Sequence, residues 1–276
     1  MRAFEADDPL RRMLDVTLRE FEPELRDRMQ VNVVDVSSTD EFVAAFNAFD
    51  GSLAIFDGHG RHDRGAPHGT LAIGRFEIDV FALYHRIRVP PIVWLSACGT
   101  HPLDGVENSV ASAFLLMGAR SVLGTNLPVD GPNAAVLVSR FLFRLANFLP
   151  MLNATIPWTE VIAGMLRMSY VTDVLRTLQG RLQIPNGTYR RLHVEANMAI
   201  NTFRRDWFDN LLTGVAAETG RDRDAVRDLW LRSCYFTDTL RYVHLGVPEH
   251  MFIVPDADEQ PEMPANGDAD ANRDGS

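Results

Sequence analysis

Two residues of this 276-residue chain could act together in nucleophilic chemistry: His59 in "LAIFDGHG" and Cys98 in "IVWLSACGT". Each comes directly after an apolar, strand-like run. A cysteine thiolate attacks carbonyl carbon atoms, and an imidazole within reach takes the thiol proton or protonates the leaving amine. The pattern indicates a Cys–His pair of the kind that thiol proteases use, if the fold brings the two strand ends together.

Glycines flank the histidine at positions 58 and 60. Because glycine has no Cβ, its backbone can approach a bound chain closely. The N–H groups of Gly60 and Cys98 are therefore candidates for an oxyanion hole. Asp57, just before the first glycine, is a weaker candidate for substrate binding.

The same stretch offers a second chemistry, because it also holds His62, Asp63 and His68. Imidazole and carboxylate groups are good ligands of zinc and iron. Together with His59 these residues fall in one predicted loop, without a helical i, i+4 pair or an evident distant carboxylate. A metal-dependent hydrolase is retained as an alternative, whereas the thiol chemistry needs no cofactor.

The second cysteine and the remaining histidines have no such arrangement. Cys234 lies in "LWLRSCYFTDTL", at helical spacing from Trp230, and is predicted to pack in a core. Five further histidines are predicted to be structural or surface residues: His85, His101, His193, His244 and His250. Among them only His101 is near Cys98 in sequence, so it is the one possible substitute base.

The elements that must position His59 and Cys98 follow from the hydrophobic pattern. Four apolar runs are predicted as strands, at 31–36, 52–57, 90–97 and 120–127. Three helices are predicted at 37–49, 109–119 and 132–149. Strand, helix and strand within thirty residues indicate a βαβ unit, and hence an α/β fold with a mostly parallel sheet. Active sites of such sheets form outside the carboxyl ends of the strands, where both residues would lie.

The rest of the chain surrounds this α/β part. Residues 9–29 predict an amphipathic helix, imperfect around Pro23, within an N-terminal segment 1–30. Residues 58–70 are predicted as a polar loop, and 70–87 as a short hairpin or strand leading into a helix. From 157 to 242 the pattern is helical, and 250–255 predicts a final strand. The tail 256–276 is predicted to be disordered, because it is acidic and poor in large apolar residues.

Composition excludes several function classes. The tail 256–276 holds seven acidic residues and one arginine, so it carries −6 of the net charge of −10. The remaining residues are nearly neutral and show no basic stripe of the kind that binds nucleic acid. All 27 basic residues are arginine, which excludes lysine-dependent phosphate loops and Schiff bases. Two cysteines make no disulfide scaffold. With no apolar run of membrane-spanning length and no signal-like start, a cytoplasmic location without membrane contact is predicted.

One segment resembles a known family. "LSACGT", followed by "ENSVASAFLLMGARSVLGTNLPVDG", is similar to the signature of CHAT domains, caspase-like peptidases often found with TPR repeats. In that family the "LSAC" segment carries the nucleophile, and an upstream segment that matches "IFDGHG" carries the histidine. The resemblance covers about residues 31–150, with a weaker similarity at 245–255.

The resemblance implies a caspase–hemoglobinase fold, a three-layer α/β/α arrangement in which His59 and Cys98 form the catalytic dyad. The CHAT domain is then expected at 31–255, with a helical insertion at about 157–242 that is longer than a minimal domain needs. This insertion could be a lid, a partner surface or an autoinhibitory element. Leu127 stands where the family has tryptophan. The first strand is not found before residue 31, so either the N-terminal helix replaces it or the chain is part of a larger sensor protein.

The predicted function is that of a cysteine endopeptidase acting on a protein substrate. Since uncontrolled proteolysis harms a cell, the enzyme is expected to be latent until a regulatory or sensor partner triggers it in a signalling or defence system. Ser96 and Ala97 precede Cys98 where basic-specific relatives carry an acid, so a basic P1 preference loses support. A catalytically idle, caspase-like interaction module is the alternative.

Overall fold

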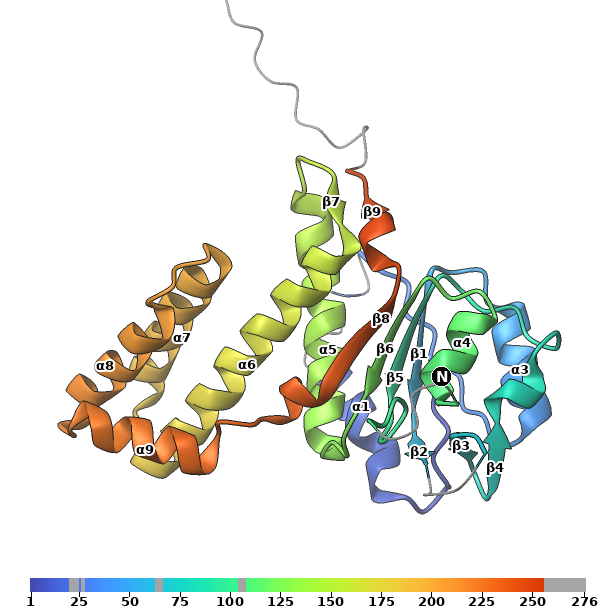
Figure 1. Cartoon of the computed structure of the whole chain (residues 1–276), viewed down its shortest axis with the longest axis horizontal. Coiled ribbons are helices and arrows are strands. Elements are labelled where there is room, and N and C mark those ends of the chain that lie inside the picture. The colour runs from blue at the N-terminus through green and yellow to red at the C-terminus, as the bar shows by residue number, and fades with distance from the viewer. Residues whose placement is uncertain (20–24, 26–27, 63–66, 104–107, 256–276) are drawn as a thin grey trace, which may run out of the picture.

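A central sheet of four strands organises the molecule (Figure 1). The computed structural model describes residues 1–19, 25, 28–62, 67–103 and 108–255. The sheet has the order β1-β5-β6-β8, and its strands are β1 (Leu53–Asp57), β5 (Ile92–Ser96), β6 (Ser121–Thr125) and β8 (Tyr242–Gly246). The first three run parallel, and β8 runs antiparallel to β6. The predicted strands at 52–57, 90–97 and 120–127 are confirmed.

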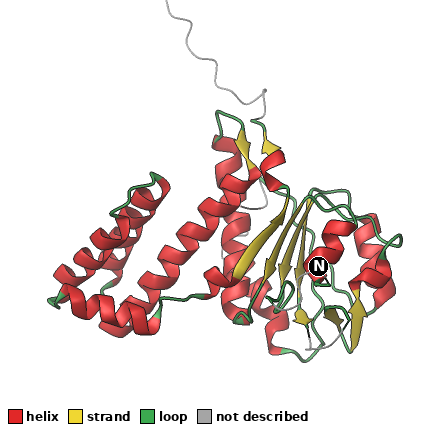
Figure 2. Cartoon of the chain, viewed as in Figure 1, coloured by secondary structure: helices red, strands yellow, loops and turns green. Residues whose placement is uncertain are grey.

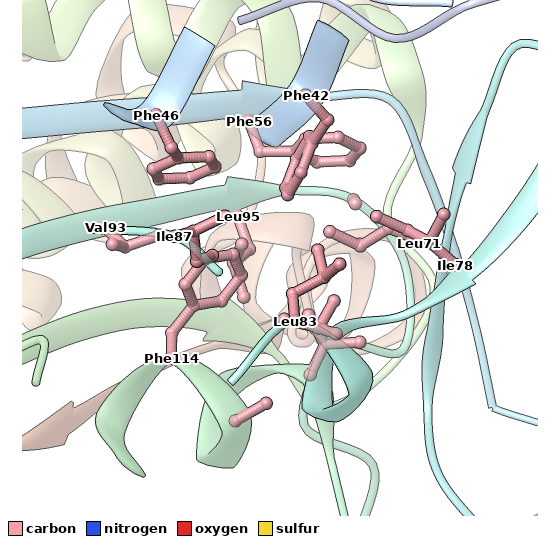
Figure 3. Close-up of a cluster of buried hydrophobic side chains, with 14 of the residues drawn as sticks. Phe42, Phe46, Phe56, Leu71, Ile78, Leu83, Ile87, Val93, Leu95 and Phe114 are labelled. Atoms are coloured by element: carbon pink, nitrogen blue, oxygen red, sulfur yellow. The ribbon is translucent and has the colours of Figure 1, made fainter. Parts of the chain in front are cut away.

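Helices cover both faces of this sheet. One face packs against α3 (Thr39–Ala48) and α4 (Val110–Leu116), and the other against α1 (Met13–Arg19) and α5 (Gly131–Phe148). Side chains alternate along β5: Val93 points into the first core and Trp94 into the second. Figure 3 shows the first core, in which rings from α3 (Phe42, Phe46) and α4 (Phe114) gather on the same face of the sheet as Val93 and Leu95 of β5. The mixed α/β fold with a mostly parallel sheet is thus confirmed.

A second, smaller sheet follows β1. It is antiparallel and consists of β2 (His59–Arg61), β3 (Thr70–Ile73) and β4 (Phe76–Asp79), and it leads into the 3-10 turn η2 (Val80–Leu83). The predicted loop at 58–70 is therefore wrong at its start, because His59 pairs with Ala72 as part of a strand. Asp63 lies outside the described residues.

The place beside β1 is taken by the first residues of the chain. Arg2 bridges in parallel to Asp57 on one side and to Asp35 on the other. The predicted strand at 31–36 is wrong, since Asp35 alone makes a bridge and Val31, Val33 and Val34 are exposed. Residues 1–3 fill the position that this run would need. The chain then forms η1 (Pro9–Arg12) and α1, in partial agreement with the predicted helix at 9–29.

Four helices form a separate arm between β6 and β8 (Figures 1 and 2). They are α6 (Trp158–Leu182), α7 (Asn186–Asn201), α8 (Trp207–Thr219) and α9 (Arg223–Ser233). The first part of α6 packs on the core of α5, whereas its second part shares its own core with α7–α9. The predicted helical stretch at 157–242 is confirmed up to Ser233.

The end of the fold corrects the prediction for the last strand. The 3-10 turn η4 (Asp238–Arg241) leads into β8, which lies where the helical pattern was expected to end. After η5 (Pro248–His250), β9 (Phe252–Ile253) pairs only with β7 (Ile156–Pro157), which follows η3 (Leu149–Met151). The strand at 250–255 is thus shorter than predicted and belongs to no large sheet.

One described segment, Gly131–Met151, is long and apolar enough to cross a membrane by length and composition alone. It is α5 with its following turn. Half of it is buried inside the protein, where Val138 and Phe141 pack in the core beside Trp94. In this structure α5 is therefore a core helix.

Candidate active site

The carboxyl ends of β1 and β5 bring His59 and Cys98 to the same edge of the sheet. Asp57 and Ser96 are register partners at the ends of the two parallel strands. His59 lies two residues beyond Asp57, and Cys98 two residues beyond Ser96. The Gly58 N–H donates to the Ser96 carbonyl at 3.3 Å, which keeps the two segments together after the strands end. This is the juxtaposition that the sequence predicts.

Gly60 lies directly against the nucleophile segment. A Cβ at this position would meet the Cys98 carbonyl oxygen at 2.4 Å and the Thr100 methyl group at 3.2 Å. Only glycine fits here, because contacts under 3.0 Å force the backbone to move. The predicted oxyanion-hole residues Gly60 and Cys98 are thus neighbours, and their role stays a prediction.

The turn that carries Cys98 is fixed by the end of β6. The Thr125 hydroxyl donates to the Ala97 carbonyl at 2.7 Å, and the Thr125 N–H donates to the Thr100 hydroxyl at 2.8 Å. Gly99 follows Cys98 at a φ of 59°, which favours glycine. The backbone at Cys98 therefore has little freedom to rearrange.

The Cys98 sulfur is partly exposed and contacts the backbone of Val129. Its Sγ accepts from the Val129 N–H and donates to the Val129 carbonyl, each at 3.4 Å. Two residues of η4 hold this loop in turn. Arg241 donates to the Pro128 carbonyl, and Asp238 accepts from the Asp130 N–H at 3.2 Å.

The His59 imidazole is bound by a carboxylate that the sequence analysis missed. Its Nε2 lies 2.7 Å from Asp8 Oδ2, and its ring meets the Phe4 ring edge-on, with centroids 5.2 Å apart. Burial acts to raise the pKa of Asp8, but hydrogen bonds to His59 and to the Leu10 N–H prevail and lower it. In the sequence, Asp8 before Pro9 indicates only the start of a helix.

The two reactive groups do not bond to each other in this structure. Among the described residues, no hydrogen bond joins the His59 imidazole to the Cys98 thiol, since Asp8 binds the former and Val129 the latter. The imidazole is about half exposed, at 47 %. The site thus holds both groups at one edge, each with another partner.

Asp57, the weak candidate for substrate binding, lies in the interior instead. It is only 6 % exposed, and it accepts from the Ser96 hydroxyl at 3.2 Å. Burial raises the pKa of this carboxyl to about 6. Because it is enclosed beneath the strand ends, we assign Asp57 a structural role in place of the expected contact with substrate.

The histidines that the sequence suggests as metal ligands have different surroundings in the structure. His68 Nδ1 is bound to Asp79 at 2.6 Å and its ring stacks on Phe81, whereas His62 Nδ1 is buried without a partner among the described residues. The described part of the chain contains no group of three or more histidine, cysteine or acidic side chains placed to hold a metal ion. The geometry gives this alternative no support.

The substitute base and the second cysteine both have structural positions. His101 Nδ1 is hydrogen-bonded to the Ser109 hydroxyl at 2.9 Å, and burial lowers the pKa of this histidine. Cys234 is buried, which raises the pKa of its thiol to about 11 and confirms the prediction that it packs in a core. His59 and Cys98 remain the candidate pair.

Comparison with models of known protein families matches residues 47–155 to the CHAT domain. The matched segment runs from the end of α3 to the loop between η3 and β7, so it contains both His59 and Cys98 but not Asp8. No curated protein matches the chain.

Proposed function

We propose that this protein is a cysteine endopeptidase of the caspase-like type, because its residues 47–155 match the CHAT domain, a caspase-like, protease-associated family. In this proposal Cys98 is the nucleophile and His59 the general acid and base. The sheet with helices on both faces then corresponds to the three-layer core of the caspase-like fold.

The observation that carries the proposal is the pairing of the two strand ends. His59 and Cys98 stand at equal distances beyond a register pair, and Gly60 touches the Cys98 carbonyl. A site at the carboxyl ends of neighbouring parallel strands is where α/β proteins place their chemistry. Of the two cysteines, only Cys98 is accessible there.

The proposed reaction runs in two stages. His59 takes the thiol proton, the Cys98 sulfur attacks the scissile carbonyl carbon, and the N–H groups of Gly60 and Cys98 stabilise the oxyanion. His59 then protonates the leaving amine, so that the C–N bond breaks and a thioester forms. In the second stage His59 removes a proton from a water molecule, whose oxygen attacks the thioester carbon. The C–S bond then breaks, His59 returns the proton to the sulfur, and the carboxylic acid product departs.

The proposal includes latency. In the resting arrangement the backbone of Val129 binds the Cys98 sulfur, and no hydrogen bond joins it to His59 among the described residues, so the Val129 loop must release the sulfur before the two groups can exchange a proton. The Val129 loop is held by η4, the segment that joins the helical arm to β8. We propose that a regulatory or sensor protein acts on the arm and releases this loop, in a cytoplasmic signalling or defence system.

A second candidate function is an interaction module without catalysis. It is favoured by the same observation that suggests latency, namely that the imidazole and the thiol have separate partners. The two candidates differ in one property. In a protease the reactivity of Cys98 depends on His59, whereas in an idle module it does not.

Alkylation of Cys98 by iodoacetamide separates the two candidates. We expect His59→Ala to slow alkylation at pH 6 by at least about tenfold, because an unassisted cysteine thiol is protonated there. Peptide mapping by mass spectrometry assigns the adduct to Cys98 or Cys234. His101→Asn is the matched control, and it should leave the rate unchanged. Equal rates in wild type and His59→Ala over pH 5–9 would exclude the dyad and leave the interaction module.

A further inference from the structure

Resting on the proposed function, we infer that Asp8 is a positioning residue for the general base. Its carboxylate binds Nε2 of His59, which leaves Nδ1 as the nitrogen that can exchange a proton with Cys98 and substrate. Asp8 lies outside the matched CHAT segment, so the N-terminal residues would complete a site that the domain alone does not contain.

Asp8 is held firmly enough to orient a ring. Its Oδ1 accepts from the Leu10 N–H at 2.8 Å and caps η1, which leaves Oδ2 for the imidazole. The segment before it is fixed to the sheet, because the Asp57 N–H donates to the Met1 carbonyl and the Ala3 N–H to the Asp57 carbonyl, each at 2.9 Å. The carboxylate therefore has a defined position relative to the end of β1.

Among the described side chains around His59, Asp8 is the charged group that binds the imidazole. Arg61, the next side chain on the same face of β2, is paired with Glu77, and Asp57 is enclosed and bonded to Ser96. Phe4 is nearly buried and packs edge-on against the imidazole, which restricts ring rotation. A carboxylate on one imidazole nitrogen fixes the tautomer and stabilises the imidazolium that forms during proton transfer.

The chain also contains a matched pair away from the site. Asp79 caps η2 with Oδ1 at 2.9 Å from the Phe81 N–H, and its Oδ2 binds His68 Nδ1 at 2.6 Å. The arrangement is similar to that at Asp8, except that Asp79 binds Nδ1 and Asp8 binds Nε2; β2, which carries His59, and β4, which carries Asp79, are the two edge strands of the small sheet. It provides a control for the structural effect of removing a capping carboxylate that binds a histidine.

The test measures the pH profile of Cys98 alkylation by iodoacetamide in the full chain. We expect Asp8→Asn and Asp8→Ser to slow alkylation at pH 6–7 by about tenfold, which corresponds to losing one favourable charge contact on a half-exposed group. Serine and asparagine both cap helices well, so both variants keep η1. Asp79→Asn should leave the Cys98 profile as in wild type.

The outcomes distinguish this inference from the proposed function. If His59→Ala slows alkylation but both Asp8 variants, folded as judged by circular dichroism, keep the wild-type profile, Asp8 has only a capping role and the inference fails alone. If His59→Ala has no effect, the dyad fails and the inference fails with it. If Asp79→Asn slows Cys98 alkylation as much as Asp8→Asn does, the inference is also overturned, because the effect would then arise from any disturbance of the small sheet.

Discussion

At the scale of single residues, Gly60 has no room for a side chain, because a Cβ there would lie 2.4 Å from the Cys98 carbonyl oxygen. A methyl group there must displace either β2 or the nucleophile turn, and Thr125 already fixes the latter. We expect Gly60→Ala to lower the free energy of unfolding by about 1–3 kcal/mol and to slow alkylation of Cys98. Chemical denaturation and the iodoacetamide assay measure the two effects.

Gly180→Ala on α6 is the control for this change, because a Cβ at Gly180 meets nothing within 4 Å. In a helix interior alanine is favoured over glycine by about 1 kcal/mol, so this variant should be equal to or more stable than wild type. A Gly60→Ala protein with wild-type stability and wild-type alkylation would show that β2 and Cys98 are not in close contact.

His244 gives the fold a pH dependence at the residue scale. It lies in β8, and its Nε2 is hydrogen-bonded to the Ser121 hydroxyl at 2.8 Å. The same hydroxyl oxygen accepts a hydrogen bond from the Trp158 indole N–H. Burial lowers the pKa of His244 to about 4, from an ordinary value of 6.5. Between these values the unfolded chain binds the proton and the folded chain does not, so stability falls as pH decreases from about 6.5 to 4.

Relative to His244→Gln, we expect the wild-type chain to lose about 1–2 kcal/mol of unfolding free energy as the pH falls over that range. This value allows for solvent screening at a half-buried side chain. Glutamine keeps a polar partner for Ser121 but does not titrate. Asp57 acts in the opposite direction, since its raised pKa of about 6 stabilises the fold at low pH and loses this effect as pH rises from 3.8 to 6. Parallel stability curves for wild type and His244→Gln would contradict the assignment.

At the scale of secondary-structure elements, the strands buried on both faces could be predicted and those defined by distant pairing could not. β1, β5 and β6 appear in the sequence as apolar runs because they lie between two layers of helices. The run at 31–36 has the composition of a strand, yet residues 1–3 occupy the position beside β1. Nothing local in "MRA" indicates that pairing.

The same distinction applies to the candidate site. The positions of His59 and Cys98 follow from the rule that active sites form at the carboxyl ends of parallel strands. Asp8 and Val129 could not be predicted, because they reach the site across 51 and 31 residues of sequence. β8 was missed for a related reason. Its five residues become a strand through antiparallel pairing with β6, which lies far away in the sequence: Ser121 of β6 and His244 of β8 are hydrogen-bonded although 123 residues separate them.

η4 is hydrogen-bonded to the loop that contacts the Cys98 sulfur, and a single substitution tests whether it restrains this loop. Arg241 donates to the Pro128 carbonyl, and a hydrogen bond from a charged group contributes about 1.5–3 kcal/mol. We expect Arg241→Ala to release Val129 from the sulfur and to raise the rate of Cys98 alkylation by up to about tenfold. Arg232→Gln, at the end of the neighbouring α9, is the control and should have no effect. An unchanged or slower rate in Arg241→Ala would show that the loop does not restrain Cys98.

At the scale of the whole molecule, the α/β body and the helical arm share α6 and little else (Figure 1). A cavity of about 270 Å³ lies where they meet, lined by Arg140, Asp173 and Asp238 among others. Asp238 also accepts from the Asp130 N–H, next to the residue that contacts the Cys98 sulfur. A change at this junction therefore has a short physical route to the nucleophile, which is what a partner-dependent protease requires.

The most direct test of the account is an inventory of new protein N-termini after co-expression of the chain with the proteins encoded beside it. We predict that the wild-type chain and Cys234→Ala generate the same new N-termini in a protein substrate, and that Cys98→Ala and His59→Ala generate none. Cleavage products that are identical in wild type and Cys98→Ala would contradict the assignment of this protein as a cysteine endopeptidase.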